Sequence, residues 1–380
     1  MKTNLVNPAI ESQHHSGRVI SLDVLRGFAM FWIIGTDHLV RGLKDISDSS
    51  VARFASGQFT HASWEGFTFY DHIFPLFLFV MGASLVLSLD KTLAFGDRGA
   101  AVNRIFRRFV LLYVLGMIAD GGVEAMGEEN IFMGVLQRIA WCYLFSGVLY
   151  LTLGTRTLIA VCATTLAFYW AILSFVPLPG VEEISFEKHR NWPNYIDSYL
   201  INTFFIPSET HRVRYDPEGV LSTFPATLNC LFGVFAGLLL KSSLTDRRKV
   251  CVFVLIGIGM LVFGHLWGTQ FPIVKRLWTS SYALVGGGWS FLLLGATYFF
   301  VDICKWQRGF SVFVWIGANS LAIYMAVHLI NFENIAARIF GGPVAATFGE
   351  YGNLVNATAA VGLAVYLCYL FYRQRIFVRV

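Results

Sequence analysis

The chain alternates between long apolar runs and shorter polar stretches over nearly its whole length. Ten of the runs are long enough, or nearly so, to cross the hydrocarbon core of a bilayer, which is about 30 Å thick and needs roughly 20 helical residues. They cover residues 19–40, 70–89, 109–122, 131–152, 156–176, 220–241, 250–268, 280–302, 311–330 and 353–372. The third run is the shortest. This pattern predicts an all-α fold, a polytopic membrane helix bundle of about ten transmembrane helices, and a single membrane domain over residues 1–380.

The composition supports a membrane location. Hydrophobic residues make up 56% of the 380 residues and charged residues only 14%, against about 25% charged in soluble domains. Residues 1–17 are polar and have no apolar core ahead of a cleavage site, so we expect no cleaved signal peptide and a first run that stays in the membrane. The six cysteines lie in or at the ends of the runs without metal-like spacing, so we expect buried apolar cysteines and no metal site.

The basic residues predict an orientation. If the N-terminus is cytoplasmic, the inner loops hold more Lys and Arg than the outer loops, and the compact clusters at 104–108, 247–249 and 373–379 are all inner. We therefore predict that both termini are cytoplasmic, that His61 lies on the outer side, and that the chain is a multi-pass protein of the inner (plasma) membrane. The net charge of +5 is then a signal of topology and not of nucleic-acid binding.

Three outer segments, 41–69, 177–219 and 331–352, are long enough to build structure. The middle one mixes prolines, aromatics and charges, which predicts an ordered cap and not a flexible linker. Its aromatic side chains fit either the interfacial belt of a membrane protein or stacking on a sugar ring. The chain has no internal repeat, which is the sequence signature of many transporters.

Ionisable groups inside membrane spans are costly and tend to be functional. Asp23 and Arg26 are three residues apart on a helix, so they can neutralise each other, or Arg26 can hold an anionic ligand. Asp37 stands near the outer end of the same helix. Asp71 begins the second span, where it can orient an imidazole or interact with the helix dipole. Gln137 and Arg138 lie in the fourth span.

Arg138 needs a partner at that depth. The candidates are a structural ion pair with Asp71, Glu128 or Glu129, or a bound phosphate. In the ninth span, polar side chains recur at every fourth residue along roughly 12 Å of one helical face. This stripe faces either a cavity or a polar neighbouring helix, and it comprises Ser320, Tyr324 and His328, with Asn319 beside them.

His61 is the strongest candidate for chemistry. The polar stretch that follows it leads directly into the apolar run from Ile73 to Leu89. A histidine side chain can take or give a proton near neutral pH, and this one is expected where a buried cavity meets water. If the protein is an enzyme, His61 is the predicted base.

Six motifs occur in the order found in one known family. They are Ser21–Gly27, His61–Gly66, Phe74–Gly82, Gly134–Arg138, Tyr215–Gly219, and Asn319-Ser320 followed by Tyr324 and His328. On these residues, the chain resembles the heparan-α-glucosaminide N-acetyltransferase family, including its bacterial relatives, from about residue 18 to 372.

The resemblance implies an activity. Members of the family take acetyl-CoA from the cytoplasmic side and acetylate an amino sugar on the opposite side, and the resemblance makes His61 the catalytic histidine. It also favours a homodimer. One departure concerns the acceptor: the eukaryotic member has an asparagine in the active site where Asp37 stands here.

We therefore predict a membrane acyltransferase that moves an acetyl group from cytoplasmic acetyl-CoA to a sugar outside, with His61 as general base or acyl carrier. The alternative is a transporter or permease for a sugar or an amphiphile. The expected partners are acetyl-CoA as co-substrate, a sugar acceptor, the lipid bilayer and a second copy of the chain, without nucleic acid or metal.

Each candidate residue has an expected role. The CoA phosphates would lie among inner basic residues such as Arg26, Arg104, Arg107 or Arg108, and Asn319, Ser320 or Tyr324 would stabilise the oxyanion. The catalytic candidates are His61, Asp71 and Asn319; the acetyl-CoA candidates are Arg26, Arg138, Gln137, Ser320, Tyr324 and His328; the acceptor candidates are Asp37, Trp64, Asp216 and Glu218.

Overall fold

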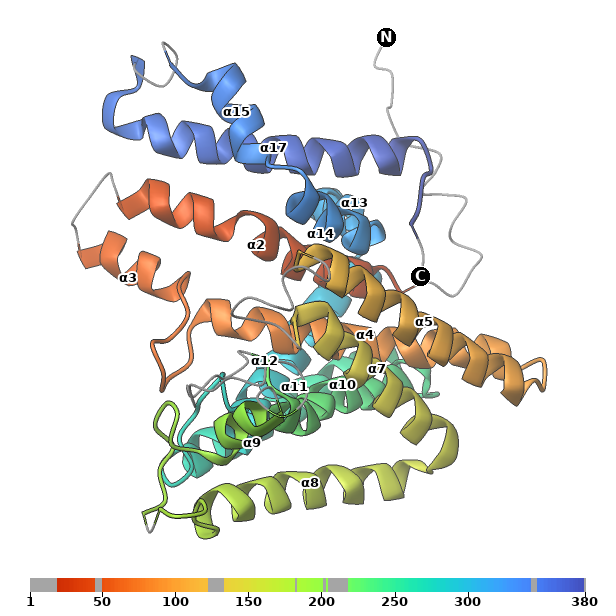
Figure 1. Ribbon diagram of the computed structural model, residues 1–380. Coiled ribbons are helices and arrows are strands. Elements are labelled where there is room, and N and C mark those ends of the chain that lie inside the picture. Colours follow the sequence, from red (N-terminus) through yellow and green to blue (C-terminus); the bar gives the residue numbers. More distant parts are fainter. Residues whose placement is uncertain are drawn as a thin grey trace.

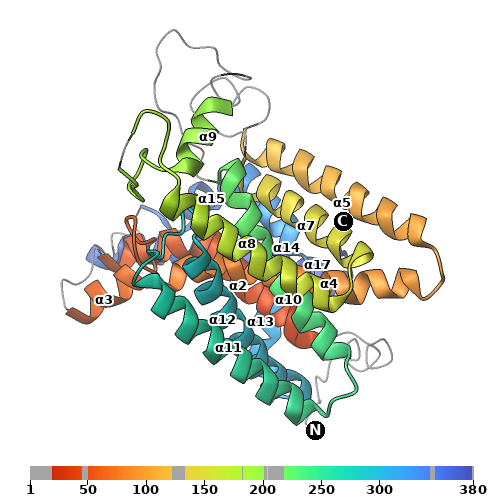
Figure 2. The same ribbon diagram turned by 90° about the horizontal axis from the view of Figure 1, so that it is seen from below.

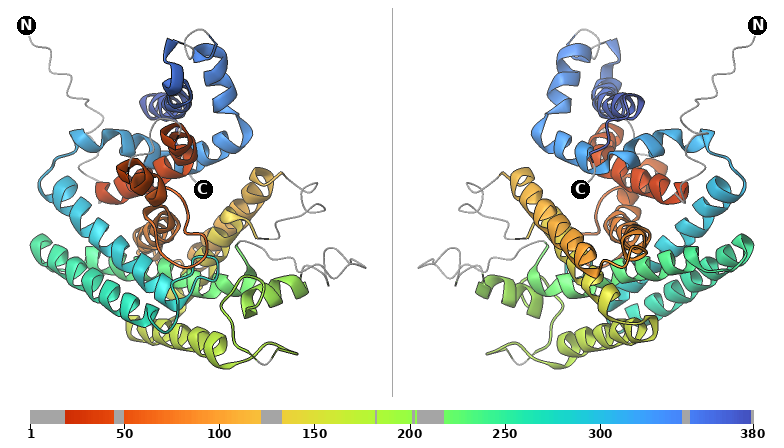
Figure 3. Two further views of the ribbon diagram at one scale, coloured as in Figure 1. Left: turned by 90° about the vertical axis from the view of Figure 1, so that its left-hand side faces the viewer. Right: turned by 90° about the vertical axis from the view of Figure 1, so that its right-hand side faces the viewer.

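The computed structural model describes residues 19–44, 50–121, 133–181, 183–200, 203, 218–342 and 347–378. Within these ranges, every regular element is a helix, and the long helices run side by side in one bundle (Figure 1). Seen along α2 and α17, the helices enclose a central region and do not form a flat layer (Figure 3).

The long helices are α2 (Ile20–Lys44), α4 (Phe69–Leu93), α5 (Arg98–Ala119), α7 (Val135–Thr152), α8 (Thr155–Phe175), α10 (Val220–Lys241), α11 (Asp246–Gly268), α12 (Ser280–Thr297) and α17 (Gly352–Arg373). A π-helical turn, Tyr298–Ile303, extends α12. Two shorter helices, α13 (Ser311–Ala318) and α14 (Ser320–Leu329), meet at an angle of 66°. The short helices α3 (Ser50–Gln58), α9 (Trp192–Leu200) and α15 (Phe332–Phe340) lie beside the ends of the long ones.

Each of the ten predicted runs falls on a helix, and the run 311–330 falls on the bent pair. Among the described residues, seven helices are long and apolar enough to cross a membrane, and the bent pair would be an eighth if it is one span. The helices α2 and α5 do not meet that criterion, because ionisable side chains occur along both. The fold is thus helical and membrane-like as predicted, whereas the number of ten spans is not confirmed.

The helix that carries the third run begins well before the run does. The helix α5 begins at Arg98 and not near residue 109, and Asp97 caps it by accepting a hydrogen bond from the N–H of Ala100 at 2.8 Å. Four arginines in its first half lower the local hydropathy, so the apolar signal starts well after the helix does. Capping by an aspartate marks the true start.

The helix α4 is the centre of the bundle. It is apolar on all sides and buried along most of its length, with α10, α2, α12 and α7 packed around it (Figure 2). A Cβ on Gly82 would overlap the carbonyl of Cys230, and a Cβ on Gly233 would overlap the carbonyl of Phe79. These two glycines therefore let the α4 and α10 backbones touch. Small residues at helix interfaces allow such close approach in membrane proteins.

A second backbone contact places the bent helix pair. A Cβ on Gly27 of α2 would overlap the carbonyl of Phe313, and a Cβ on Gly317 of α13 would overlap the carbonyl of Asp23. The bend follows immediately, at Asn319. Broken helices at membrane depth occur where the backbone is buried in protein or lines a cavity, and here the bend brings α14 beside α2 and α5.

Contacts between helix ends define two opposite faces of the bundle. On one face, Asp302 accepts hydrogen bonds from the N–H groups of Ile20 and Ser21, and Asp90 accepts from Tyr150 and pairs with Lys241. We call this the basic face, because the predicted inner clusters border it. The opposite ends, including residues 50–69, 176–200 and 268–280, form the His61 face. The loops named on each face are ones that the sequence grouped together as inner or outer. Which face is cytoplasmic and which is exterior stays a prediction.

The described part of segment 177–219 is ordered. The indole N–H of Trp192 donates to the carbonyl of Val176 at 2.7 Å, and the amide of Asn191 donates to Asn194 and to the carbonyl of Glu187. These bonds hold α9 against the His61 face. Most of residues 201–217 lies outside the described residues.

Candidate active site

The turn before α4 brings His61 and Asp71 together. Thr68 caps α4 and forms a reciprocal capping box with Asp71. One carboxylate oxygen of Asp71 lies 2.8 Å from Nδ1 of His61, and the other accepts hydrogen bonds from the backbone N–H groups of Ala62 and Thr68, each at 3.1 Å. The Asp71 side chain is fully buried. The capping geometry therefore fixes the carboxylate that holds the imidazole.

This contact determines which ring nitrogen of His61 is available. An ionised carboxylate only accepts hydrogen bonds, so the ring proton belongs on Nδ1 and the lone pair on Nε2. The ring is stacked on Tyr70 with centroids 4.5 Å apart, and 41% of the side chain remains exposed. His61 thus presents a basic nitrogen to the surroundings, oriented by a buried carboxylate as in the hydrolase triads.

Lys275 is a third member of this cluster, and sequence reasoning missed it. It lies in the loop between α11 and α12, with Nζ 2.9 Å from Nδ1 and 3.0 Å from Nε2 of His61, and 3.6 Å from Asp71. Burial lowers the pKa of Lys275 to about 8, while the carboxylates of Asp71 and Glu218 raise it in partial compensation. A lysine in an outer loop carries no sequence signal of this position, because only the folded chain brings it to His61.

A cavity of about 760 Å³ opens beside His61 and follows α4. Tyr70 near the start of α4 and Lys91 near its end both line it, and 21 residues of helix rise about 31 Å. That length matches the hydrocarbon core of a bilayer. One cavity therefore connects the surroundings of His61 with the basic face.

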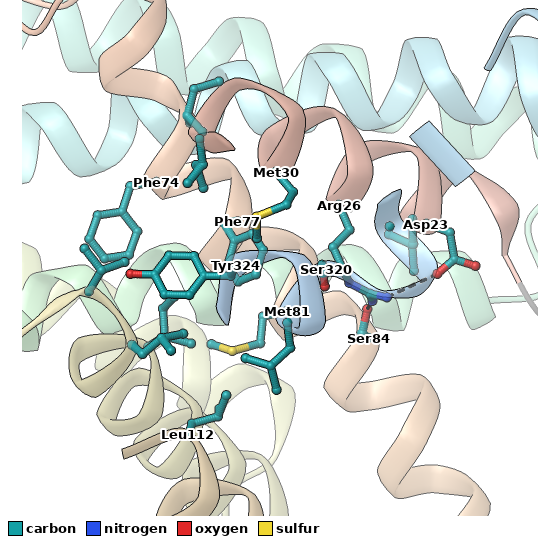
Figure 4. Close-up of a pocket in the computed structure, with 18 of the residues that line it drawn as sticks. Asp23, Arg26, Met30, Phe74, Phe77, Met81, Ser84, Leu112, Ser320 and Tyr324 are labelled. Atoms are coloured by element: carbon teal, nitrogen blue, oxygen red, sulfur yellow. Dashed lines mark hydrogen bonds and ion pairs between the residues drawn. The ribbon is translucent and has the colours of Figure 1, made fainter. Parts of the chain in front are cut away.

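The two ends of the cavity differ in charge from its middle. Glu218 and Lys275 join His61 at one end; the other carries four basic side chains, Arg26, Lys91, Arg104 and Arg108. The middle is apolar, with Met30, Phe77, Met81 and Leu112 facing the space (Figure 4). A long molecule with a charged head and a less polar tail would match this distribution.

Arg26 is held in place at the edge of the basic end. Its guanidinium donates to Asp23 at 3.1 Å and to the hydroxyl of Ser84 at 2.6 Å (Figure 4). The predicted pairing of Asp23 with Arg26 is confirmed. Farther along, the guanidinium of Arg108 stacks over the ring of Tyr143 at 4.6 Å, and its Nε has no hydrogen-bond partner within the described ranges.

The polar stripe of the ninth span lines the cavity. Ser320 lies beside Arg26, and Tyr324 lies farther toward Phe74 (Figure 4). His328 also lines the cavity and stacks on Tyr324 with ring centroids 4.2 Å apart. Of the two alternatives for this stripe, the structure shows the cavity.

Asn319 does not line the cavity. It is buried at the bend, and its side-chain oxygen accepts a hydrogen bond from the N–H of Val378 at 3.2 Å. Its amide nitrogen has no partner among the residues that the structure describes. This bond holds the C-terminal segment so that Phe377 and Val378 form part of the cavity wall. A direct role of Asn319 toward the thioester stays a prediction.

Gln137 and Arg138 also lie behind the wall. Arg138 is fully buried and donates to the carbonyl of Glu218 and to the hydroxyl of Ser222, and its guanidinium stacks 5.0 Å from the ring centroid of Trp278. Gln137 donates to Asp120 at 3.0 Å. No carboxylate pairs with Arg138 in the described part of the chain, and the candidates Glu128 and Glu129 lie outside it. Within the described residues, backbone, hydroxyl and aromatic groups are the partners of Arg138, and a pairing with Glu128, Glu129 or a phosphate stays a prediction.

The predicted acceptor residues are only partly visible. The indole N–H of Trp64 donates to the carbonyl of Phe186 at 2.8 Å, and the ring packs against the aromatic cluster around Phe271, so it joins the cap to the site. Glu218 lines the cavity. Asp216 and the side chain of Asp37 lie outside the described residues.

The cysteine prediction was correct in part. Four of the six are buried, whereas Cys251 is exposed on α11 and Cys304 is exposed directly after the π-helical turn. In the described ranges, no group of three or more His, Cys, Asp or Glu side chains could hold a metal ion.

Comparison with known proteins places the chain in a family. A sequence model described as "Heparan-alpha-glucosaminide N-acetyltransferase, catalytic" matches residues 18–253. The chain belongs to this family. Its match to human heparan-alpha-glucosaminide N-acetyltransferase is 26% identical over 417 residues, covering 95% of this chain and 59% of the human protein. The mouse protein of the same name is 27% identical over 373 residues, covering 84% of this chain and 56% of its own length.

The resemblance inferred from the six motifs is thus confirmed. The chain spans less than two thirds of the length of the human and mouse acetyltransferases that it matches. His61 and Asp71 fall inside the matched range of this acetyltransferase family, whereas Lys275 and the bent pair α13 and α14 lie beyond it.

Proposed function

We propose that the protein is a membrane-embedded acyltransferase that moves an acetyl group from cytoplasmic acetyl-CoA to a sugar of the amino-sugar class on the outer side of the membrane. Family membership supports the reaction class. The observation that carries the proposal is the cavity that joins a basic end to the His61–Asp71 pair along the whole of α4.

The cavity accounts for a donor and an acceptor on opposite sides of a bilayer. The phosphates of CoA would bind at the basic end, where Arg26, Arg104 and Arg108 provide charge-assisted hydrogen bonds. The pantetheine arm would follow the apolar middle, past Ser320 and Tyr324, and bring the thioester to His61. This arrangement makes the basic face cytoplasmic, in agreement with the distribution of basic residues.

His61 performs the proton transfer in this proposal. With the ring proton on Nδ1, Nε2 takes the proton of the acceptor amine or hydroxyl as it attacks the thioester carbonyl. Asp71 keeps the ring in this tautomer and stabilises the imidazolium that forms. The same nitrogen could carry the acetyl group as an acyl-histidine. Rapid-quench trapping of acetylated protein in the absence of acceptor distinguishes the two routes.

The proposal uses only some of the predicted residues. Ser320, Tyr324 and His328 form the donor channel, and Glu218 stands where an acceptor ammonium would enter. Gln137 and Arg138 are assigned to the wall and not to acetyl-CoA, because neither faces the cavity. The homodimer is part of the proposal and rests on the resemblance alone, and the location in the inner (plasma) membrane rests on the topology predicted from the basic residues.

The test is transfer by purified protein. Acetyl-CoA labelled in the acetyl group and glucosamine should yield labelled N-acetylglucosamine, and His61→Ala should lower the rate by about 10²–10⁴, as loss of a general base does. His265→Ala is the matched control, because His265 is exposed on α11 and contacts only its own helix.

Two outcomes would contradict the proposal. Near wild-type turnover by His61→Ala at saturating substrate would remove His61 as the base. If reconstituted vesicles move labelled sugar across the bilayer without acetylating it, the protein is instead a permease, which the same cavity could serve.

A further inference from the structure

The loop that carries Lys275 is rigid. The carbonyl of Ile273 accepts a hydrogen bond from the N–H of Gly66 at 2.9 Å, which ties the loop to the segment that follows His61. The hydroxyl of Thr279 accepts from the N–H of Val274 at 3.1 Å, and the ring of Trp278 is fully buried. The Lys275 backbone is therefore fixed relative to His61, and only its side chain can move.

The contacts of Lys275 are not those of a simple counterion. Its Nζ is 3.6 Å from Asp71, within the range of an ion pair but beyond a good hydrogen bond. The short contact is to the imidazole of His61. Nζ lies 2.9 Å from Nδ1 and 3.0 Å from Nε2, so the ammonium rests against the ring; since Nδ1 donates to Asp71, the lone pair available to the ammonium is the one on Nε2.

The charged and titratable groups around Lys275 come from four segments. His61 precedes α4, Asp71 begins α4, Glu218 precedes α10, and Arg276 follows on the same loop. The two carboxylates compensate only part of the desolvation of the ammonium, which lowers the pKa of Lys275 to about 8. A desolvated cation in a low-dielectric site interacts strongly with any negative charge that develops beside it.

We infer that Lys275 is a second catalytic residue: its ammonium covers Nε2 of His61 in the empty site and turns to the thioester oxygen when the donor arrives, where it stabilises the oxyanion of acetyl transfer. This inference rests on the proposed function. Of the oxyanion donors suggested by sequence, the side chain of Asn319 faces Val378, whereas Ser320 and Tyr324 line the channel; Lys275 adds a charged donor in contact with His61.

The transfer step then balances without a further reactant. The acceptor nitrogen or oxygen bonds to the acetyl carbon, the carbonyl π electrons move to oxygen, and the oxyanion accepts hydrogen bonds from Lys275. Nε2 of His61, now uncovered, receives the acceptor's proton. When the tetrahedral species collapses, the C–S bond breaks and His61 returns the proton to sulfur, which releases CoA thiol and the acetylated acceptor.

The test compares three variants in detergent-purified protein. Lys275→Met should lower kcat by about 10²–10³, as loss of an oxyanion donor does, while acetyl-CoA affinity and thermal stability stay near wild type. Lys275→Arg should restore part of kcat, because the cation is retained. Arg276→Met is the matched control, since Arg276 is the exposed cation next in sequence and does not line the cavity.

The pH dependence gives a readout that a structural role would not move. If the charged form of Lys275 is needed, kcat falls as pH rises through a value near 8 in wild type, and this limb disappears in Lys275→Arg, because arginine stays protonated. Turnover of Lys275→Met within about tenfold of wild type, or an unchanged basic limb in Lys275→Arg, overturns the inference. Absence of acetyl transfer by wild-type protein would instead contradict the proposed function itself.

Discussion

Replacing Asp71 with Asn should hold His61 in the wrong tautomer. In the native site, one buried oxygen of Asp71 faces Nδ1 of His61, and the other accepts two backbone hydrogen bonds, from Ala62 and Thr68. An asparagine side chain has one accepting oxygen and one donating NH₂ group. With the oxygen toward the two backbone N–H groups, the NH₂ group faces Nδ1, which must then accept, so the ring proton moves to Nε2.

The structure indicates how strongly the substituted asparagine side chain would prefer to keep its oxygen toward the two backbone N–H groups. The opposite orientation would place NH₂ against the N–H groups of Ala62 and Thr68, and leaving two buried donors unsatisfied costs about 2–6 kcal/mol at about 1–3 kcal/mol each. Nε2 would therefore carry the proton in nearly every molecule. The same change in the serine protease triad lowers kcat by about 10⁴, equivalent to about 5.4 kcal/mol. We expect a loss between about 10² and 10⁴.

The assay separates this effect from unfolding. kcat for acetyl transfer, acetyl-CoA affinity and thermal stability are measured for Asp71→Asn and for Glu65→Gln, whose exposed carboxylate lies in the same loop. Nitrogen NMR of labelled histidine reports the tautomer of His61 directly. A folded Asp71→Asn protein that turns over within about tenfold of wild type would refute the reasoning, because the tautomer would then not control the base.

Two other substitutions test the ends of the cavity and its wall. Arg26→Gln should weaken acetyl-CoA binding by roughly 10- to 150-fold with little change in kcat, because it removes a charge-assisted hydrogen bond worth about 1.5–3 kcal/mol. Calorimetric titration measures the acetyl-CoA affinity, and the exposed Arg247→Gln serves as the control. Unchanged affinity would exclude Arg26 from the donor site. Arg138→Met should instead lower the free energy of unfolding by about 1–3 kcal/mol, because the Glu218 carbonyl and the Ser222 hydroxyl lose a buried donor. A selective rise in KM for acetyl-CoA without loss of stability would return Arg138 to the binding site.

Local signals in the sequence predicted the helices and part of the site. The apolar runs located every long helix, because burial in lipid or in the bundle requires such runs wherever a helix crosses. The pairing of His61 with a carboxylate was also within reach, since Asp71 lies only ten residues away and begins a helix. The contact is present, whereas its catalytic role stays a prediction.

The errors arose where tertiary contacts override local patterns. Lys275 is 214 residues from His61, and nothing in its loop distinguishes it from the exposed Arg276. Arg138 was expected to pair with a carboxylate or a phosphate, and the sequence did not reveal the carbonyl, hydroxyl and aromatic groups from distant segments that contact it. The side chain of Asn319 was expected beside Ser320 in the channel, and the bend turns it toward the C-terminal segment instead.

The apolar middle of the cavity bears on the ion gradients of the cell. A channel with water and charge along its whole length would short-circuit a membrane potential, which supplies about 2.3 kcal/mol per elementary charge at 100 mV. Between the charged ends, Met30, Phe77, Met81 and Leu112 offer an ion no ligands, and neutral groups such as the hydroxyls of Ser320 and Tyr324 replace only a small part of its hydration shell. A charged side chain at the bilayer centre costs at least about 2.5–3.5 kcal/mol, so the barrier to a bare ion exceeds the driving force. Both mouths can thus be wet while the membrane stays electrically insulated.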